Sequence, residues 1–345
     1  MLSQAAGANA ISSSGEARLE AYLKDELGLD GELSVQPVAG GQSNPTFFVT
    51  VGRRRLVLRK RPAGTLLPSA HAVDREYCVQ KALAGTGVPV PTMLLYCDDP
   101  TIVGTSFYVM ERVEGRIFGD SAMASTARED RREMYASAAR VLAAIHDVDI
   151  EAAGLSDFGK HGGFIQRQLK RWSQQWQLSK ATDDPAMEKL IAWLRENIPA
   201  TDETTLTHGD FRIGNLIYHP TEPRVIAVLD WELSTLGDPL ADLAHSCAYS
   251  WHIKPDEYGG LLGVDLDAGG LPTLAEFVDE YRKASGGRRE LTDYHLAFAL
   301  FRNAAIFEGI AARARQGNAS SADAARVGAL APLFVQRGAR IAGLG

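Results

Sequence analysis

The spacing of apolar residues changes once along the chain, near Glu114-Gly115, and this change constrains the fold more than any other feature. Before it, short apolar runs rich in β-branched and aromatic residues are separated by turn residues, which is typical of antiparallel strands. After it, apolar residues recur every three or four positions, as on one face of a helix. The clearest such stripe comprises Met134, Ala138, Val141, Leu142 and Ile145. The 345 residues are therefore expected to form an α+β protein with two lobes.

The first lobe is predicted to contain a five-stranded antiparallel sheet with one crossing helix. The five runs span residues 33–38, 46–51, 56–61, 92–96 and 106–113. Helical spacing begins at Glu16 and recurs over residues 72–84, between the third and fourth runs. Residues 1–15 are small and polar without periodicity, so we expect a flexible N-terminus there, followed by lobes over 16–113 and 114–345.

Composition excludes several classes of partner. Lys and Arg number 36 against 43 Asp and Glu, with no extended basic block, which argues against nucleic-acid binding. No run approaches the roughly 18 apolar residues of a membrane span, and the first residues lack the pattern of a secretion signal, so a cytoplasmic protein is expected. The three cysteines form no C-x-x-C pair, which indicates neither a disulfide framework nor a zinc site.

Two polar clusters in the helical lobe carry the strongest chemical signal. Short strand-like runs over 205–207 and 225–229 lead into His208–Asn215 and Asp230-Trp231-Glu232. Asp210 and Asn215 lie five residues apart, and Asp230 ends the next run. Phosphoryl transfer from ATP uses such a set: one carboxylate accepts the proton of the acceptor hydroxyl, while an amide and a second carboxylate hold Mg²⁺. Either cluster alone is also typical of a turn or a helix cap, but their succession favours the chemical interpretation.

With these motifs the chain resembles the aminoglycoside phosphotransferase-like (choline kinase-like) family of small-molecule kinases, relatives of the protein kinases, over about residues 38–243. The resemblance implies a bilobal protein-kinase-like fold, with a nucleotide-binding lobe over 16–113 and a catalytic and acceptor-binding lobe over 114–345. In the family, H-G-D-x-x-x-x-N marks the catalytic loop. By this resemblance Asp210 is the catalytic base, and Asn215 and Asp230 are the ligands of Mg²⁺.

Other residues take supporting roles in the same comparison. Glu232 completes the D-x-D/E motif, and His208 is expected to brace the loop by hydrogen bonding rather than to transfer a proton. Asp242 follows in G-D-P-L-A-D-L; in the family it braces the catalytic loop, and otherwise it is an acid compensating the helix dipole. Arg212 either contacts the transferring phosphoryl group or is an exposed loop arginine.

The nucleotide contacts are expected in the first lobe. Leu56–Lys60 occupies the place of the kinase strand whose basic residue pairs with the phosphates and with a helix glutamate. Alternation places Arg59 and Lys60 on opposite faces of the strand, and matching to V-A-I-K selects Arg59, with Glu76 as its partner. The alternative is that Arg59 and Glu76 form only a solvated surface ion pair.

Two backbone segments complete the expected nucleotide site. The loop containing Gly40, Gly41, Ser43 and Asn44 is expected to cradle phosphate oxygens, although a plain hairpin turn uses the same residues. The stretch Phe107–Gly115 resembles the kinase hinge, whose backbone at Glu111 and Val113 would pair with adenine.

The sequence says less about the identity of the acceptor than about the type of reaction. Residues 294–345 hold two acids against six arginines, which disfavours a polycationic aminoglycoside and favours an anionic acceptor, unless these arginines only form a solvated helix face. The V-L-R-K-R-P and D-W-E-L-S-T-L-G-D-P-L-A-D-L segments resemble the kinase-like domains associated with acyl-CoA dehydrogenases, which suggests a hydroxyacyl-CoA or a similar hydroxylated metabolite.

We therefore predict an ATP- and Mg²⁺-dependent phosphotransferase acting on a small-molecule hydroxyl. The alternatives are a nucleotide-binding regulatory pseudokinase, an aminoglycoside, sugar or amino-alcohol kinase, and a protein kinase. The last is disfavoured because no A-P-E segment follows Asp230.

Overall fold

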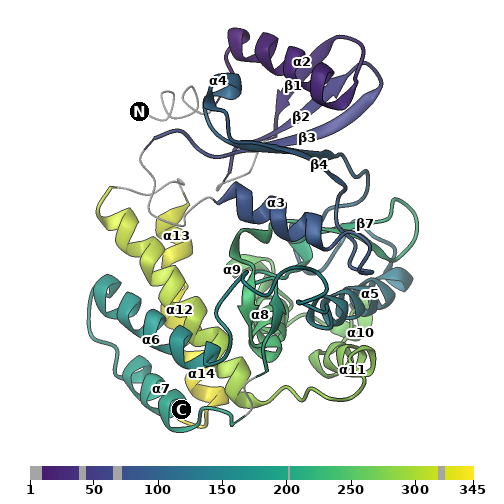
Figure 1. Ribbon diagram of the computed structural model, residues 1–345. Coiled ribbons are helices and arrows are strands. Elements are labelled where there is room, and N and C mark those ends of the chain that lie inside the picture. The colour runs from purple at the N-terminus through teal and green to yellow at the C-terminus, as the bar shows by residue number, and fades with distance from the viewer. Residues whose placement is uncertain (1–9, 39–43, 65–71, 201–202, 318–322) are drawn as a thin grey trace. The chain divides into compact units, whose positions relative to one another are not determined.

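A computed structural model of the chain describes residues 10–38, 44–64, 72–200, 203–317 and 323–345 (Figure 1). The chain divides into two compact units. The first, here called the sheet unit, comprises Met1–Glu114 with Asp230–Glu232. The second, the helical unit, comprises Gly115–Leu229 and Leu233–Gly345.

The sheet unit contains five antiparallel strands in the order β1-β2-β3-β5-β4. These are β1 (Leu33–Pro37), β2 (Thr46–Val51), β3 (Arg54–Lys60), β4 (Met93–Cys97) and β5 (Phe107–Glu111). Among the described residues of this unit, the strands are accompanied by helices α2 (Ser13–Leu27), α3 (Val73–Ala82) and α4 (Pro100–Val103). The turn from β2 to β3 requires Gly52, which has φ +57° and whose added Cβ would lie 2.2 Å from the Asp30 carbonyl oxygen.

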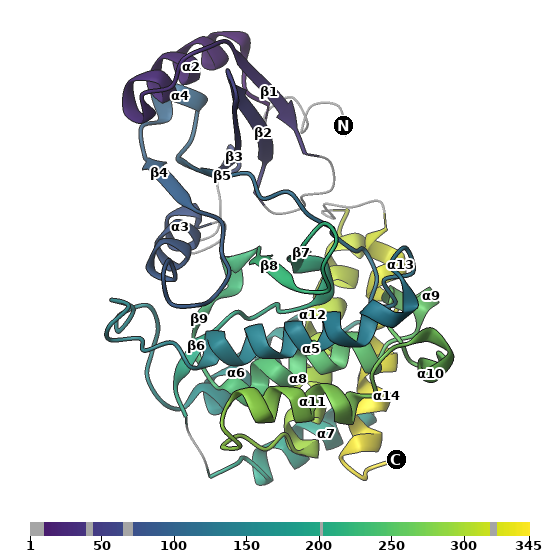
Figure 2. The ribbon, with the colours of Figure 1, turned by 90° about the vertical axis from the view of Figure 1, so that its right-hand side faces the viewer.

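The two faces of this sheet are covered by different helices. Leu56 and Leu58 of β3 belong to the core that includes α2 and α4, whereas Val57 packs with Val73 of α3 on the other face (Figures 1 and 2). This alternation sends Arg59 to the face of α3 and Lys60 into the opposite core.

Helix α2 begins earlier than the sequence pattern indicates. The hydroxyl of Ser12 accepts a hydrogen bond from the N–H of Gly15 at 3.2 Å and caps the helix. Residues 13–15, expected to be flexible, are therefore helical, because an N-cap serine stabilises a first turn that contains no apolar stripe. Residues 1–9 lie outside the described part of the chain.

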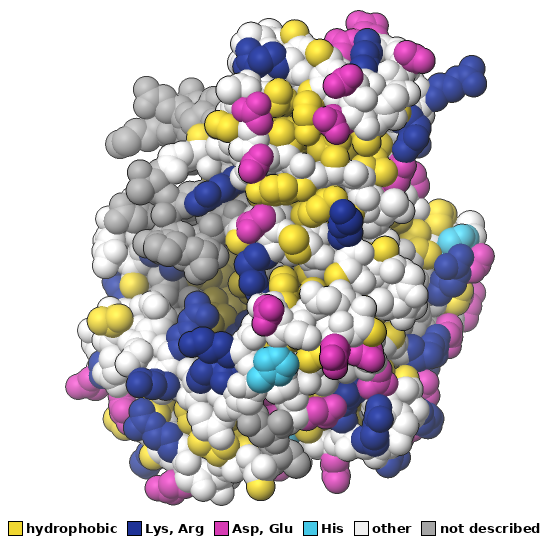
Figure 3. Space-filling model, viewed as in Figure 1, with side chains coloured by type: hydrophobic (Ala, Val, Ile, Leu, Met, Phe, Trp, Pro, Cys, Tyr) yellow, Lys and Arg dark blue, Asp and Glu magenta, His cyan; other side chains and the backbone are white. Residues whose placement is uncertain are grey.

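The helical unit is built around α12 (Asp293–Arg315), which packs against α6, α8, α13 and α14. Its other helices are α5 (Arg128–His146), α6 (Phe164–Ser179), α7 (Pro185–Glu196), α8 (Pro239–Trp251), α9 (Pro255–Tyr258), α10 (Leu266–Gly269), α11 (Leu274–Ala284), α13 (Ala324–Gly328) and α14 (Ala331–Ile341). On the face drawn in Figure 3, Lys and Arg side chains gather over α6 and α12.

The polar clusters follow strands of two short two-stranded sheets. Strand β6 (Thr205–Thr207) pairs with β9 (Thr235–Gly237), and β7 (Leu216–Tyr218) pairs with β8 (Val225–Val228). Two 3₁₀ turns accompany them, η1 (Ile213–Asn215) and η2 (Trp231–Leu233). The predicted fold class is confirmed: an α+β chain with a five-stranded antiparallel sheet, a crossing helix and a mainly helical second part. Among the described residues, none of the helices has the length and apolar character needed to cross a bilayer.

Candidate active site

The Asp210 carboxylate is held by three side chains of the helical unit. Its Oδ1 accepts a hydrogen bond from Nε2 of His245 at 3.0 Å. Its Oδ2 accepts from Nδ2 of Asn215 at 3.0 Å and from Nε of Arg212 at 3.3 Å. The side chain of Asp210 nevertheless remains 21% exposed. The carboxylate is thus fixed in orientation and open to a ligand.

This environment keeps Asp210 ionised. Burial would raise the pKa of its carboxyl group, but the hydrogen bond from His245, with Arg212 and His208, holds the pKa well below its ordinary value. At neutral pH the group is therefore a carboxylate that can accept a proton or a hydrogen bond from a hydroxyl.

A buried network braces the loop that carries Asp210. The carboxylate of Asp242, in the first turn of α8, accepts from the backbone N–H groups of His208 at 2.7 Å and Gly209 at 2.9 Å. His146 lies 3.2 Å from Asp242 through Nε2 and 2.7 Å from the hydroxyl of Tyr281 through Nδ1. Although burial opposes ionisation, the hydrogen bond and charge of His146, with His208, lower the pKa of Asp242 to about 2. Asp242 thus fixes the backbone of the loop.

His208 also has the geometry of a brace. Its Nδ1 accepts from the backbone N–H of Asp210 at 3.2 Å, and its Nε2 lies 2.9 Å from the carbonyl oxygen of Leu229, to which it therefore donates. With both ring nitrogens engaged by backbone groups, this side chain links the loop that carries Asp210 to the residue that follows β8. Gly209 between them has φ +84°, and an added Cβ would lie 2.5 Å from the carbonyl oxygen of Leu233.

Asn215 is oriented by the same loop. Its Nδ2 donates to the carbonyl oxygen and to the carboxylate of Asp210, at 2.8 and 3.0 Å, so its Oδ1 takes neither bond. Its own carbonyl oxygen accepts from the N–H of Leu229 at 2.8 Å, and Asp230 is the next residue in the chain.

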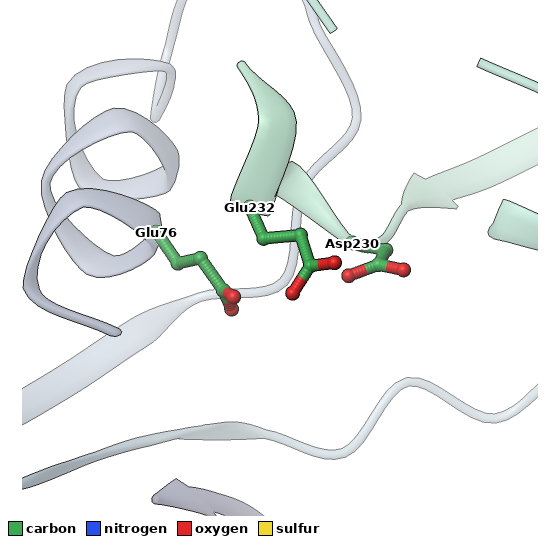
Figure 4. Close-up of side chains that lie close together, drawn as sticks. All are labelled: Glu76, Asp230 and Glu232. Atoms are coloured by element: carbon green, nitrogen blue, oxygen red, sulfur yellow. The ribbon is translucent and has the colours of Figure 1, made fainter. Parts of the chain in front are cut away.

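The sheet unit contains a second ionic cluster, centred on Arg59. Its Nε lies 3.2 Å from Glu76, and its Nη2 lies 2.8 Å from Asp230 and 3.8 Å from Glu232. Figure 4 shows the three carboxylates facing one another, and one oxygen from each lies within 4.8 Å of the others. The predicted pairing partner of Arg59 is thus in contact with it, and the pair is buried rather than a solvated surface pair.

Glu76 is fully buried and has three side-chain partners. Besides Arg59, Nδ2 of Asn44 donates to Oε1 at 2.8 Å, and the hydroxyl of Tyr108 donates to Oε2 at 2.9 Å. Burial raises the pKa of Glu76 to about 7, against the lowering effect of Arg59 and Tyr108. Lys60, by contrast, is buried on the other face of the strand and donates to the carbonyl oxygen of Val103 at 2.7 Å.

Asp230 has an unusual backbone conformation. Its φ is +66°, in the left-handed region, and Met123 is the other non-glycine residue with positive φ in the part of the chain that the structure describes. Such conformations are costly for side chains with a Cβ and cluster at functional sites. Asp230 therefore has a backbone conformation of a kind that recurs at functional sites.

The donor atoms near Asp230 suit a hard divalent cation. Carboxylate and amide oxygens are the ligands that Mg²⁺ prefers, and neither imidazole nor thiolate belongs to the carboxylate cluster. The residues present therefore fit Mg²⁺, with Asp230 and Glu232 as carboxylate donors.

Two of the remaining predicted nucleotide residues, Glu111 and Val113, lie elsewhere in the sheet unit. Gly40, Gly41 and Ser43 lie outside the described residues. Glu111 ends β5 and pairs with Arg54, and Val113 follows in the segment that ends the sheet unit at Glu114.

Sequence reasoning missed two residues that contact the loop carrying Asp210. His245 bonds Asp210, and Arg302 of α12 donates from Nη2 to the carbonyl oxygen of Gly209 at 2.9 Å. His245 lies three residues after Asp242 in α8, so helical spacing alone could have placed both on the face toward the loop. No local signal distinguishes Arg302 from the other arginines that follow it.

The comparisons with known proteins decide the family. The model of a phosphotransferase enzyme family matches residues 34–294. The chain belongs to this family. The predicted resemblance is thereby confirmed, as is the prediction of a phosphotransferase.

Similar proteins come from several organisms. The chain is 45% identical over 316 residues to acyl-CoA dehydrogenase family member 10 of Mus musculus, covering 90% of this chain and 30% of that protein. It is 42% identical over 319 residues to acyl-CoA dehydrogenase family member 11 of Homo sapiens, covering 88% of this chain and 40% of that protein. The chain thus spans well under half the length of these relatives.

Solved structures show the same fold. A Ralstonia eutropha protein provisionally named an aminoglycoside phosphotransferase is 42% identical, with a TM-score of 0.87 over 95% of this chain and 98% of that one. A type I macrolide 2'-phosphotransferase is 17% identical, with a TM-score of 0.62 over 92% of this chain and 97% of that one, and shares the fold.

Proposed function

We propose that this protein transfers the γ-phosphoryl group of ATP to a hydroxyl group of a small metabolite in the cytoplasm. The observation that carries the proposal is the Asp210 carboxylate, which three side chains orient while it stays ionised and partly exposed. A carboxylate with only a structural role has no need of that exposure.

The helical unit supplies the proton acceptor. Asp210 would accept the hydrogen bond of the acceptor hydroxyl and take its proton as the new bond from oxygen to the γ-phosphorus forms. The bond from the γ-phosphorus to the bridging oxygen breaks, and ADP leaves with that oxygen. Asp242 and His208 hold the loop in place, and Arg212 is positioned beside Asp210 to meet negative charge on the phosphoryl group.

Residues around Asp230 would hold Mg²⁺. We assign the metal to Asn215 and Asp230, supported by Glu232, because the amide oxygen of Asn215 takes neither of the bonds to Asp210 and Asp230 carries backbone strain. When bound, Mg²⁺ neutralises charge on the phosphates. Arg59, oriented by Glu76, would contact the phosphates once nucleotide competes for its guanidinium.

The rest of the nucleotide site is assigned from the family pattern. The loop with Gly40, Gly41, Ser43 and Asn44 would contact the phosphates, and the backbone of Glu111 and Val113 would contact the base.

A hydroxyacyl-CoA or a related hydroxylated metabolite is the acceptor that we favour. The relatives' names support this choice, since the matched region belongs to proteins named acyl-CoA dehydrogenase. The excess of arginine over acid in residues 294–345 supports it too, because a polycationic aminoglycoside would be repelled there.

The direct test is a reaction with a panel of acceptors. The protein is incubated with ATP, Mg²⁺ and hydroxyacyl-CoAs, sugars, amino alcohols or aminoglycosides, and the products are identified by mass spectrometry. We expect a phosphorylated hydroxyacyl-CoA, with transfer abolished when EDTA removes Mg²⁺. Tight ATP binding without transfer to any acceptor would instead indicate a regulatory pseudokinase, and transfer to aminoglycosides alone would refute the assigned acceptor.

A further inference from the structure

Two arginines of the helical unit share one tryptophan ring beside the catalytic loop. The guanidinium carbon of Arg171, on α6, lies 5.1 Å from the centroid of the Trp172 ring, and that of Arg302, on α12, lies 6.0 Å from the same centroid. Both distances are within reach of a cation–π interaction. The indole is itself fixed, since its Nε1 donates to Oε1 of Gln168 at 2.9 Å.

This pair adjoins the reacting group. Arg302 donates to the carbonyl oxygen of Gly209, the residue immediately before Asp210. Helix α6 packs against α12, and Arg171 lies close enough to Arg302 for their like charges to interact. A ligand held by these two arginines would therefore lie next to the hydroxyl that Asp210 is proposed to deprotonate.

Neither arginine of the pair forms a direct ion pair within the part of the chain that the structure describes. Among the described residues, no carboxylate lies within about 4 Å of either guanidinium group. Other arginines of the helical unit are paired: Arg289 with Glu203, Arg315 with Glu308, and Arg337 with Glu257.

Arg302 is also partly removed from solvent. Burial, together with the like charge of Arg171, lowers the pKa of Arg302, although Asp210 and Asp242 act in the opposite direction. Two neighbouring positive charges without a directly paired carboxylate, in such surroundings, favour binding of an anion. Figure 3 shows Lys and Arg side chains gathered over α6 and α12, the two helices that carry the pair.

We infer that Arg171, Arg302 and Trp172 form a phosphate-binding subsite of the acceptor site, so that the acceptor is a hydroxylated molecule that carries phosphate. The inference rests on the proposed function and narrows its substrate class. Guanidinium groups suit this role because each offers two parallel N–H donors to a phosphate.

The test compares an acceptor that carries phosphate with one that does not. A hydroxyacyl-CoA and the matching hydroxyacyl-pantetheine carry the same hydroxyl and thioester, but the second lacks both the phosphates and the adenosine of CoA. The matching hydroxyacyl-phosphopantetheine, which has one phosphate and no adenosine, is therefore measured beside them and should keep a KM close to that of the CoA acceptor. We expect the KM for the pantetheine to be at least about tenfold higher, as for the loss of one charge-assisted contact. Added salt should raise the KM for the CoA acceptor because it screens this contact.

Arg171→Gln tests the subsite without touching the catalytic loop. This variant should raise the KM for the hydroxyacyl-CoA at least about tenfold more than the KM for the pantetheine, with a much smaller change in kcat. Lys170→Gln is the matched control, because Lys170 is the neighbouring exposed cation of α6 and lines a groove toward α7 instead. The control should leave both KM values unchanged.

The outcomes separate the subsite from the reaction. Equal KM values for the two acceptors, unaffected by Arg171→Gln, would overturn the subsite and leave the reaction standing. If Arg171→Gln loses affinity for a free hydroxy acid but not for the CoA thioester, then the two arginines bind a carboxylate of the acceptor, and the proposal that they bind phosphate is wrong.

If neither acceptor is phosphorylated, the proposed function fails, and calorimetry with CoA alone tests the subsite. Binding that Arg171→Gln weakens and Lys170→Gln does not would support the subsite, and equal binding by all three proteins would refute it.

Discussion

His245 should control the protonation of Asp210. Its Nε2 lies 3.0 Å from the Asp210 carboxylate, and its Nδ1 is buried with no hydrogen-bond partner in the described structure. Burial lowers the pKa of His245, so the ring is neutral at pH 7 and its one N–H points at Asp210. The expected role is to orient the carboxylate and to keep it ionised, which makes His245 a positioning residue.

The size of the effect follows from the bond that is lost. A hydrogen bond to a charged group contributes about 1.5–3 kcal/mol, so His245→Ala should lower kcat/KM about 10- to 100-fold. The pKa of Asp210, which His245 helps to depress, should rise toward its ordinary value. Because the base works only when ionised, the acidic limb of the pH–rate profile should move to higher pH.

The assay is the pH dependence of kcat/KM for the wild type and two variants of His245. His245→Gln keeps an N–H donor, so its kcat/KM and the pH of its acidic limb should lie between those of His245→Ala and the wild type. His252→Gln, which removes a half-buried imidazole at the end of the same helix, should leave the acidic limb in place. An unmoved acidic limb in His245→Ala would refute the assigned role, whatever the loss of rate.

Three further predictions concern the supporting residues. Asp242→Asn should destabilise the helical unit by about 2–4 kcal/mol in urea unfolding at pH 7, because the amide turns a donor toward backbone N–H groups. Since the folded pKa of Asp242 is depressed to about 2, that difference should shrink as the pH falls below the unfolded value of 3.8. The pKa of Glu76 is raised to about 7, so the free energy of unfolding of the sheet unit should fall by up to about 3 kcal/mol as the pH rises from 4.5 to 7. Hydrogen exchange of the sheet amides measures this change, and in Glu76→Gln the change should be much smaller. Lys60→Met should change the KM for ATP by no more than about twofold, whereas Arg59→Met should raise it at least about tenfold. If steady-state kinetics show the larger increase for Lys60→Met, then Lys60 and not Arg59 contacts the phosphates.

The sheet unit could be predicted because its signals are local. Alternation along Leu56–Lys60 is enough to place Arg59 and Lys60 on opposite faces, and the structure has them there. Whether Arg59 is exposed to solvent or forms an ion pair depends on α3, which covers its face of the sheet. The acidic residue Glu76 in that helix made the ion pair predictable.

The helical unit was harder to predict, because tertiary packing selects its important residues. Sequence reasoning expected two short strands near the polar clusters, whereas the structure adds β7 and β9, each only three residues long and too short to show periodicity. Arg302 reaches the loop only because α12 runs against α8, which no spacing within α12 reveals.

The central claim is that the Asp210 carboxylate accepts the proton of the acceptor hydroxyl, and one measurement on Asp210→Ala tests it most directly. With saturating ATP and Mg²⁺ and the acceptor found in the panel, single-turnover transfer should fall at least about 100-fold. The Kd for ATP should change by much less, because the carboxylate is proposed to contact the acceptor hydroxyl. Transfer within a few-fold of the wild-type rate, with ATP bound normally, would contradict the account.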